Sequence, residues 1–400
     1  MEKTINVQRI AIMTGIGHGF THVYQVVLPP LYPLLIEEFS FSYIQLGSLA
    51  TAMTLSYGLS QALMGPLSDR IGRKNLLLWG GALFALATLL TGLARDFNQL
   101  LVFQILGGIG GSVYHPVAMA LVTDVTVHKG RGRAMGIQGS GGVVGNAVTP
   151  PLVIFLAILI NWRWALIMLG LLGLLFIPIL HRYLEESPVS LRSGSATREG
   201  PHEGHGKESQ GLLRWGFFAV LLAIWMSRSM INRGFMTFLP SYLVDVYGFS
   251  LGLSGFFLAI YWLLASLGYF VGGELADRYD RLLMLLISMA TTTGGLFILV
   301  FLPFESQLLL RVNFLLLGAL FFLGVPSLFS IYADNLKPHK RGTFFSVGFT
   351  LGFTGSALIP VLMGFFADRW GMALAFLPVL GISLLSLGFI GFAQGMKIKR

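Results

Sequence analysis

Five ionisable side chains lie deep inside long apolar stretches of this chain, where charge is costly and often functional. They are His18, His22, His115, Arg228 and Arg233. His18 and His22 are four residues apart, so they share one helix face near the middle of the first apolar stretch. Because histidine titrates near physiological pH, each of the three histidines could carry a proton. The alternative for each is a neutral histidine that is hydrogen-bonded between helices.

The histidine spacing would also allow a zinc site at His18 and His22. No carboxylate or cysteine accompanies the two residues in their apolar stretch, so we expect no metal there. Two glycine-rich stretches, 107–111 and 139–145, could be mistaken for phosphate loops. They lie within apolar segments and precede no Lys-Ser/Thr pair, so we expect them to serve close helix packing. We expect no cofactor.

The two arginines share an apolar stretch with Asn232, and no Asp or Glu lies deep in any such stretch. A cavity built from these residues would be neutral to positive and would favour an anion, because the guanidinium fork suits carboxylate, phosphate or phosphonate groups. Five residues turn a helix by about 140°. We therefore expect one arginine to face the cavity and the other a neighbouring helix, with Asn232 holding Arg228. The alternative is that both pair with backbone carbonyls. The predicted substrate-binding residues are Arg228, Arg233, Asn232, His22, Gln25, Tyr24 and His115.

Composition identifies the elements that must position these residues. Charged residues make up 11% of the 400 residues, against roughly 25% in soluble domains. This scarcity excludes a soluble enzyme, a disordered protein and a nucleic-acid-binding domain, and the net charge of +9 is dispersed between apolar runs. Cysteine is absent, so there is no disulfide framework or thiolate site. An integral membrane protein remains, with the bilayer as its surroundings.

The apolar stretches predict an all-α protein with twelve membrane-spanning helices, since each is about 20 residues long. The predicted spans are 10–36, 43–64, 75–94, 99–125, 134–159, 164–181, 215–240, 251–271, 282–303, 308–333, 343–366 and 372–394. With the N-terminus inside, 21 of the 27 Lys and Arg residues fall in inner segments. This bias predicts cytoplasmic termini in a cell inner membrane.

A polar stretch divides the chain into two halves. Residues 182–214 are charged and rich in Ser and Gly, which predicts a flexible cytoplasmic linker between a bundle at 1–181 and a bundle at 215–400. We expect His202 and His205 in this linker to be solvated. The halves are repeats: at an offset of 210, Pro116 matches Pro326 and Asp124 matches Asp334. Two related six-helix bundles imply a transporter with its site between them.

The segment from Gly65 to Lys74, Gly-Pro-Leu-Ser-Asp-Arg-Ile-Gly-Arg-Lys, resembles the signature loop of the major facilitator superfamily. The twelve spans and the central linker extend this resemblance over the whole chain. Within that superfamily, Gly17-His18 to Phe39 and Gly110 to Pro116 resemble the fosmidomycin-resistance group of efflux proteins. Thr21-His22 stands where that group is expected to have Asn-Asp. The stretch Gly141 to Pro150 resembles a degraded antiporter signature.

The signature segment also has a physical interpretation as a gate. Gly65 would allow close packing of helix ends, and Asp69 is an anion that can face a helix N-terminus. Arg70 and Arg73 can pair with Asp124. In the second half the corresponding charges are Asp277, Arg278 and Asp334. The predicted gating residues are Gly65, Asp69, Arg70, Arg73, Asp124, Asp277, Arg278 and Asp334. The alternative is that these charges only set topology.

Together these features predict a secondary transporter, not an enzyme, that alternates between inward- and outward-open states. The expected function is proton-driven efflux of small organic compounds, anionic or amphiphilic, by a monomer. The alternative is proton-coupled uptake of an organic anion. A membrane enzyme or sensor would need a convergent catalytic cluster or an output domain, and neither is visible. No nucleotide-binding loop is present, so the energy is expected to come from an ion gradient.

Overall fold

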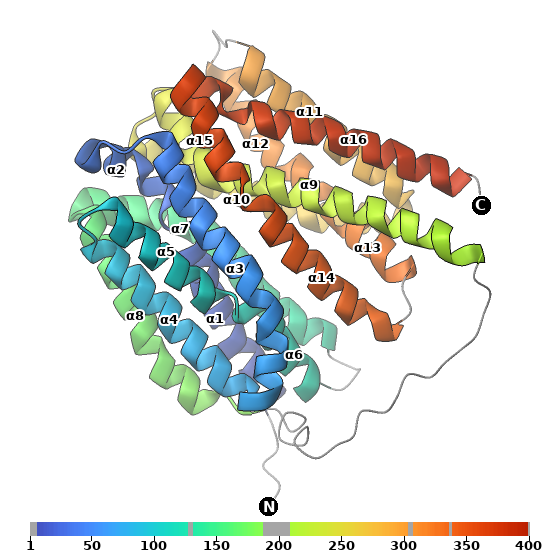
Figure 1. Ribbon diagram of the computed structural model, residues 1–400, viewed down its shortest axis with the longest axis horizontal. Helices are drawn as coiled ribbons and strands as arrows, with labels where there is room; N and C mark the ends of the chain where they lie inside the picture. Colours follow the sequence, from blue (N-terminus) through green and yellow to red (C-terminus); the bar gives the residue numbers. More distant parts are fainter. Residues whose placement is uncertain (1–5, 127–130, 187–208, 303–306, 336–337, 399–400) are drawn as a thin grey trace, which may run out of the picture.

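The computed structural model describes residues 6–126, 131–186, 209–302, 307–335 and 338–398, and within them the chain is helical. Figure 1 shows two groups of helices side by side, blue to green for the first half and yellow-green to red for the second. The first group comprises α1 (Val7–Val26), η1 (Pro29–Leu31), α2 (Tyr32–Phe39), α3 (Tyr43–Ile71), α4 (Arg73–Leu93), α5 (Phe97–Gly111), α6 (Tyr114–Val125), α7 (Arg131–Leu159) and α8 (Trp162–Tyr183).

The second group repeats this plan. It comprises α9 (Ser209–Asp245), α10 (Leu251–Arg278), α11 (Arg281–Phe301), α12 (Gln307–Leu323), α13 (Val325–Asn335), α14 (Pro338–Ser356), α15 (Ile359–Trp370), η2 (Met372–Phe376) and α16 (Leu377–Ile398). The helices fall on all twelve predicted spans, with α5 and α6, α12 and α13, and α14 and α15 each forming one interrupted span. Nine stretches within the described helices meet a strict test of length and hydropathy for crossing a membrane. The predicted all-α fold of two six-helix bundles is confirmed.

Two predicted boundaries were wrong. The span expected over 10–36 ends at Val26, because Pro29 and Pro30 lack the N–H groups that would continue the helix. The signature segment 65–74, expected to be a loop, is helical on both sides of one residue. Gly72, with a φ of 92°, is the only break between α3 and α4. The predicted linker falls partly outside the described residues, and α9 already begins at Ser209, within the last part of that segment.

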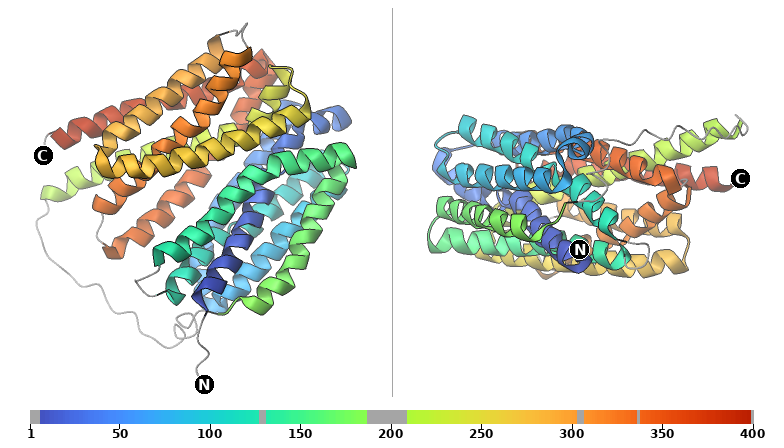
Figure 2. Two further views of the ribbon diagram at one scale, coloured as in Figure 1. Left: turned by 180° about the vertical axis from the view of Figure 1, so that it is seen from behind. Right: turned by 90° about the horizontal axis from the view of Figure 1, so that it is seen from below.

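Glycines set the spacing of α1 and α7 (Figures 1 and 2), as predicted for the glycine-rich stretches. A Cβ added to Gly141 would lie 1.8 Å from the backbone oxygen of Gly15, and one added to Gly145 would lie 2.5 Å from that of Gly19. Side chains at these positions would therefore force the helices apart. This close contact brings the middle of α1, with its histidines, directly against α7.

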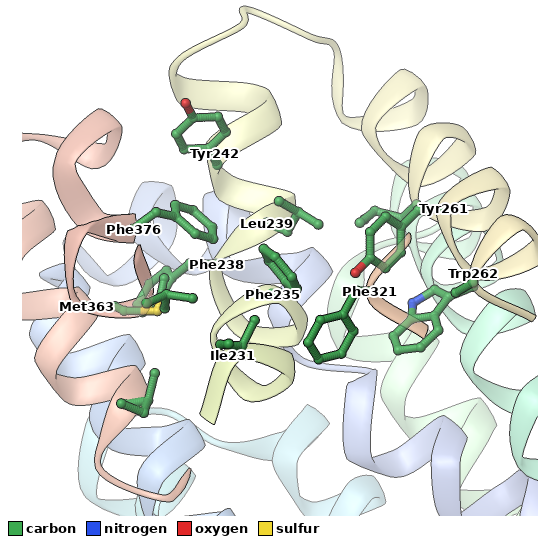
Figure 3. Close-up of a cluster of buried hydrophobic side chains, with 14 of the residues drawn as sticks. Ile231, Phe235, Phe238, Leu239, Tyr242, Tyr261, Trp262, Phe321, Met363 and Phe376 are labelled. Atoms are coloured by element: carbon green, nitrogen blue, oxygen red, sulfur yellow. The ribbon is translucent and has the colours of Figure 1, made fainter. Parts of the chain in front are cut away.

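The second half is organised around α9. Figure 3 shows Phe235, Phe238 and Tyr242 of this helix packed among aromatic and aliphatic side chains from α10, α12, α15 and η2. Phe235 and Phe238 are at most 2% exposed. In the bilayer such side chains stabilise the bundle mainly through their van der Waals packing against one another. This end of α9 is thus anchored, and its polar residues 228–233 lie next to the anchored region.

The two bundles touch at the end of the molecule that is distant from the start of α1 and the end of α16 (Figure 1). Asp368 of α15 accepts hydrogen bonds from the backbone N–H groups of Tyr43 and Ile44 at the start of α3, both at 2.8 Å. The Tyr43 hydroxyl donates to Asp245 of α9 at 2.7 Å. Figure 2, left, shows α7 (green) and α10 (yellow) meeting near this end and diverging toward the other. The central cavity lies between the bundles, nearer to the start of α9 than this contact.

Candidate functional site

A cavity of about 270 Å³ lies between the two bundles. The first bundle contributes His22 and His115 to its wall, and α9 contributes Arg228, Asn232 and Arg233. The rest of the wall is mainly aromatic and comes from α9, α12, α13 and α14. No acidic side chain is among the described residues that line it. The sequence prediction of a neutral to positive cavity therefore matches the geometry.

The three membrane histidines form one cluster on the first-bundle side of the cavity. The Nε2 atoms of His18 and His22 are 3.1 Å apart. The ring of His115 lies edge-on to both, with centroid distances of 4.9 Å to His18 and 5.5 Å to His22. His18 is 7% exposed, whereas His22 and His115 are partly buried and reach the cavity. The spacing of His18 and His22 predicted their contact, whereas His115 joins the cluster because α6 packs against α1.

Two residues of α7 orient the histidine rings. His18 Nδ1 is 2.9 Å from the backbone oxygen of Gln138, and His22 Nδ1 is 3.1 Å from Oδ1 of Asn146. Both Gln138 and Asn146 are buried. The sequence prediction missed them, although the glycines around them in 139–145 could have indicated that this face of α7 lies against α1. The cluster is therefore held from the side opposite the cavity.

The two arginines both line the cavity, so the prediction that only one would do so was wrong. Arg228 reaches toward α12, where its guanidinium donates to the backbone oxygen of Phe321 and lies 4.4 Å over that ring. Arg233 lies 5.7 Å from the ring centroid of Phe353 on α14. The long side chains compensate for the angle between their positions on α9, so that both reach the same cavity.

The Arg228 guanidinium and the Asn232 amide retain unused hydrogen-bonding capacity. Nη1 of Arg228 is buried without a hydrogen-bond partner among the described residues. Asn232 does not hold Arg228 as predicted: its amide nitrogen lies 3.5 Å from the sulfur of Met236, and its oxygen is also unpartnered in the described part of the chain. Unpaired buried polar groups are costly unless a ligand satisfies them. The arginine side of the cavity is thus prepared for an acceptor group.

Tyr24 and Gln25, also predicted to bind substrate, lie away from the cavity. The Tyr24 hydroxyl donates to the backbone oxygen of Leu169 at 3.1 Å, and its ring packs on Phe84 inside the first bundle. Gln25 is buried and is not part of the cavity wall. Tyr24 points into the bundle interior, whereas Gln25 shares the face of His18 and His22 but lies farther along α1 than the cavity wall extends.

The predicted gate residues form an ion cluster at the opposite end of the first bundle from the bundle contact. Arg73 pairs with Asp124 of α6 and lies 4.0 Å from Asp69 of α3. Asp69 is largely exposed, as is Arg70, whereas Arg73 and Asp124 are mostly buried. All four residues belong to one bundle, so this cluster fastens α3, α4 and α6 to one another.

Two details of the predicted gate were different. Nothing lies within 4 Å of a Cβ added to Gly65, so that glycine serves no close helix contact. The anion at the start of α4 is Glu186, which accepts from the N–H groups of Arg73 and Lys74 at 2.9 and 3.1 Å. Sequence analysis placed Glu186 in the linker and missed this role.

The second copy of the ion cluster is only partly described. Asp277 and Arg278 at the end of α10 are exposed. The backbone of Asp334 lies in α13, but its side chain is outside the described residues, as are His202 and His205. The pairing predicted for this half stays a prediction.

The chain is similar to several known membrane transporters. It is 30% identical to the probable sulfoacetate transporter SauU of Cupriavidus necator over 62% of this chain and 60% of that one. It is 23% identical to the hexuronate transporter of Bacillus subtilis over 90% and 89% of the two chains. In structure it resembles a bacterial homolog of the human lysosomal transporter Spinster in an inward-facing conformation, with a TM-score of 0.81, 18% identity, and coverage of 100% and 98%.

The sequence profile of the Major Facilitator Superfamily matches residues 14–360, which include most of both bundles and every cavity residue discussed above. These relatives are transporters and not enzymes. The chain therefore belongs to the Major Facilitator Superfamily of membrane transporters.

Proposed function

We propose that this transporter moves a small organic anion together with a proton, by alternating access and as a monomer with both termini in the cytoplasm. The observation that carries the proposal is the shared cavity: Arg228 and Arg233 line it with His22 and His115, and no described lining residue is acidic. The arginines are the expected anion site, and the histidine cluster is the expected proton site. Sulfoacetate and hexuronates, for which two relatives are named, are organic anions of this class.

The sign of the charges favours symport over exchange. A proton bound at the histidines adds positive charge beside the cavity, so it raises the affinity of the cavity for an anion. By thermodynamic reciprocity the anion raises the affinity for the proton by the same factor, typically about 5–150-fold. Ligands that favour one another's binding travel together, whereas exchange requires each to displace the other. The geometry therefore supports the uptake alternative better than efflux of anions.

Proton-driven efflux is the second candidate. It is favoured by the sequence resemblance of Gly141 to Pro150 to an antiporter signature and of α1 and α5–α6 to the fosmidomycin-resistance group. Exchange requires the cargo and the proton to exclude each other from the cavity. A cation and a proton do so through charge repulsion, so this candidate predicts a cationic or neutral amphiphilic cargo.

A flux assay separates the two candidates. The protein is reconstituted in liposomes that contain a pH-sensitive dye, and sulfoacetate, a hexuronate or choline is added outside. Symport predicts that an anion acidifies the lumen and that Arg228→Ala and Arg233→Ala abolish the signal. Alkalinisation, a response to choline alone, or full activity of both variants would contradict the proposal.

A further inference from the structure

His18 and His22 face one another through nitrogen atoms that cannot both be neutral acceptors. The backbone oxygen of Gln138 only accepts hydrogen bonds, so His18 Nδ1 carries a hydrogen and donates to it at 2.9 Å. Oδ1 of Asn146 likewise accepts from His22 Nδ1 at 3.1 Å. In neutral histidines both Nε2 atoms would then present lone pairs to each other at 3.1 Å. A cation between them removes this repulsion.

We propose that His18 and His22 bind a single proton between their Nε2 atoms, and that Asn146 is the positioning residue that holds the pair in this state. This inference rests on the proposed function, which requires a proton site but does not say which histidine provides it. One Nε2–H donates to the other Nε2, and 3.1 Å is a normal distance for such a bond. The positive charge is then spread over two rings, each of which donates from Nδ1 to an oxygen of α7.

A metal ion is a less suitable occupant of this gap. Histidine nitrogens on a tetrahedral zinc ion lie about 2.0–2.1 Å from the metal and so about 3.3 Å from one another. The ring nitrogens of the three histidines are separated by up to 4.8 Å. Because the His18 and His22 nitrogens are 3.1 Å apart, His115 would have to move closer to complete a zinc site. The pair itself is already at the distance that a proton requires.

The surroundings link this proton to the cavity. The titratable and charged groups that face the pair are Tyr114 and His115 from α6 and Arg233 from α9. The helices α4, α5, α7 and α8 carry titratable side chains only in their terminal turns. The positive charge of Arg233 repels a proton on the pair. An anion bound at Arg233 would cancel this repulsion. Protonation of the pair is therefore expected to follow occupancy of the cavity.

Nuclear magnetic resonance tests the shared proton without any substrate. The full chain is labelled with ¹⁵N-histidine and studied in lipid nanodiscs, with His18→Gln and His22→Gln used for assignment. We expect a scalar coupling between the two Nε2 nuclei at acidic pH, together with a hydrogen on both Nδ1 atoms. The assignment is wrong if His22 carries its only hydrogen on Nε2, as a neutral pair would. It is also wrong if a transition metal co-purifies stoichiometrically and is lost in His22→Gln.

Transport assays then test the role of the pair. We expect His18→Gln and His22→Gln to abolish proton-driven accumulation of sulfoacetate or hexuronate but to retain counterflow exchange, which needs no net proton movement. The matched control is His181→Gln, which changes a histidine in the last turn of α8, outside the cluster and the cavity wall, and should keep proton coupling. Asn146→Leu should lose coupling, whereas Asn146→Asp, which still accepts from Nδ1, should keep it with a displaced pH profile. Equal effects of Asn146→Leu and Asn146→Asp would overturn the positioning role.

These results separate the two proposals. A shared proton in the spectra without any anion-dependent proton flux would refute the proposed function and leave the proton pair in place. Proton-coupled anion transport that persists in His18→Gln and His22→Gln would refute the pair alone.

Discussion

The two sides of the cavity are related by the sequence repeat but carry different basic groups, histidines on one side and arginines on the other. At the repeat offset of 210, His18 corresponds to Arg228, and His22 corresponds to Asn232. Gly142 corresponds to Gly352, and each packs against the first helix of its own bundle. A Cβ on Gly142 would meet His18 and His22 of α1, and one on Gly352 would meet Ser229 and Trp225 of α9.

This comparison shows how a duplicated bundle can acquire two functions. The repeat retains Gly142 and Gly145 of α7 as Gly352 and Gly355 of α14, which pack against α1 and α9, whereas Gly141 corresponds to Leu351. One wall carries imidazole groups, which can be neutral or protonated, and the other carries guanidinium groups, which stay charged. On our account, a proton occupies the first wall and an anion the second.

The comparison fails first if the arginine wall is not the anion site. We predict that Arg233→Ala or Arg228→Ala weakens anion binding by about 10–100-fold, because each removes a buried, charge-assisted hydrogen-bond donor. Lysine substitutions should recover part of the affinity. The measurement is calorimetric titration of the anion that gives the largest flux, with Ser229→Ala, a neutral change in the same wall, as the control. Unchanged affinity in both alanine variants would contradict the assignment.

The histidine wall depends on the contact between α1 and α7. We predict that Gly141→Ala destabilises the protein by about 1–3 kcal/mol, since the added Cβ overlaps the backbone of α1. Gly139→Ala is the matched control, because it lies two residues away and its Cβ meets nothing within 4 Å. Thermal unfolding in detergent, followed by tryptophan fluorescence, gives the comparison. Equal melting temperatures of the two variants would show that this contact tolerates widening.

Asp368 is one of the residues that join the two bundles, and so it helps to keep the two walls of the cavity facing each other. We predict that Asp368→Ala shifts the balance of conformations toward the state open at that end, by about threefold to tenfold, or roughly 0.7–1.4 kcal/mol. The variant loses two hydrogen bonds to the start of α3. The chain has no cysteine, so pairs of introduced cysteines can carry spin labels for distance measurements. Asp96→Ala, which removes a cap within one bundle, is the control and should leave the distances unchanged.

The smallest effects are expected at the ion cluster of the first bundle, which we propose to be part of the gate. Asp124→Asn should reduce transport more than Asp69→Asn, because it leaves the buried Arg73 without its closest anion. Asp69 is largely exposed and 4.0 Å from Arg73, a contact worth about 0–1 kcal/mol. Initial transport rates of the two variants, corrected for the amount in the membrane, test this order. The reverse order, or normal transport by both, would argue against the gate.

Much of the fold could be predicted because it depends on composition and repetition. Twelve apolar stretches, the repeat and the inner basic residues gave the two bundles, and glycine-rich runs indicated close packing. The break at Pro29 and the continuous helix through Gly65 were missed, since hydropathy measures polarity and gives no information on where the backbone turns.

The site could be predicted only in part. Ionisable residues in apolar stretches identified the five side chains of the two walls, because burial without function is costly. Their partners could not be predicted: Gln138 acts through its backbone oxygen, and Asn146 is one of several polar residues on α7. The orientation of Arg228 and Arg233 depends on the reach of the side chains and on helices α12 and α14, which helix rotation alone does not describe.

The central claim is that a proton on one wall and an anion on the other favour each other's binding. The most direct test is calorimetric titration of the anion in buffers with different ionisation enthalpies at about pH 7, which counts the protons taken up on binding. The account predicts uptake of up to one proton per anion in the wild type and none in His22→Gln. Proton release on binding, or uptake that is unchanged in His22→Gln, would contradict it.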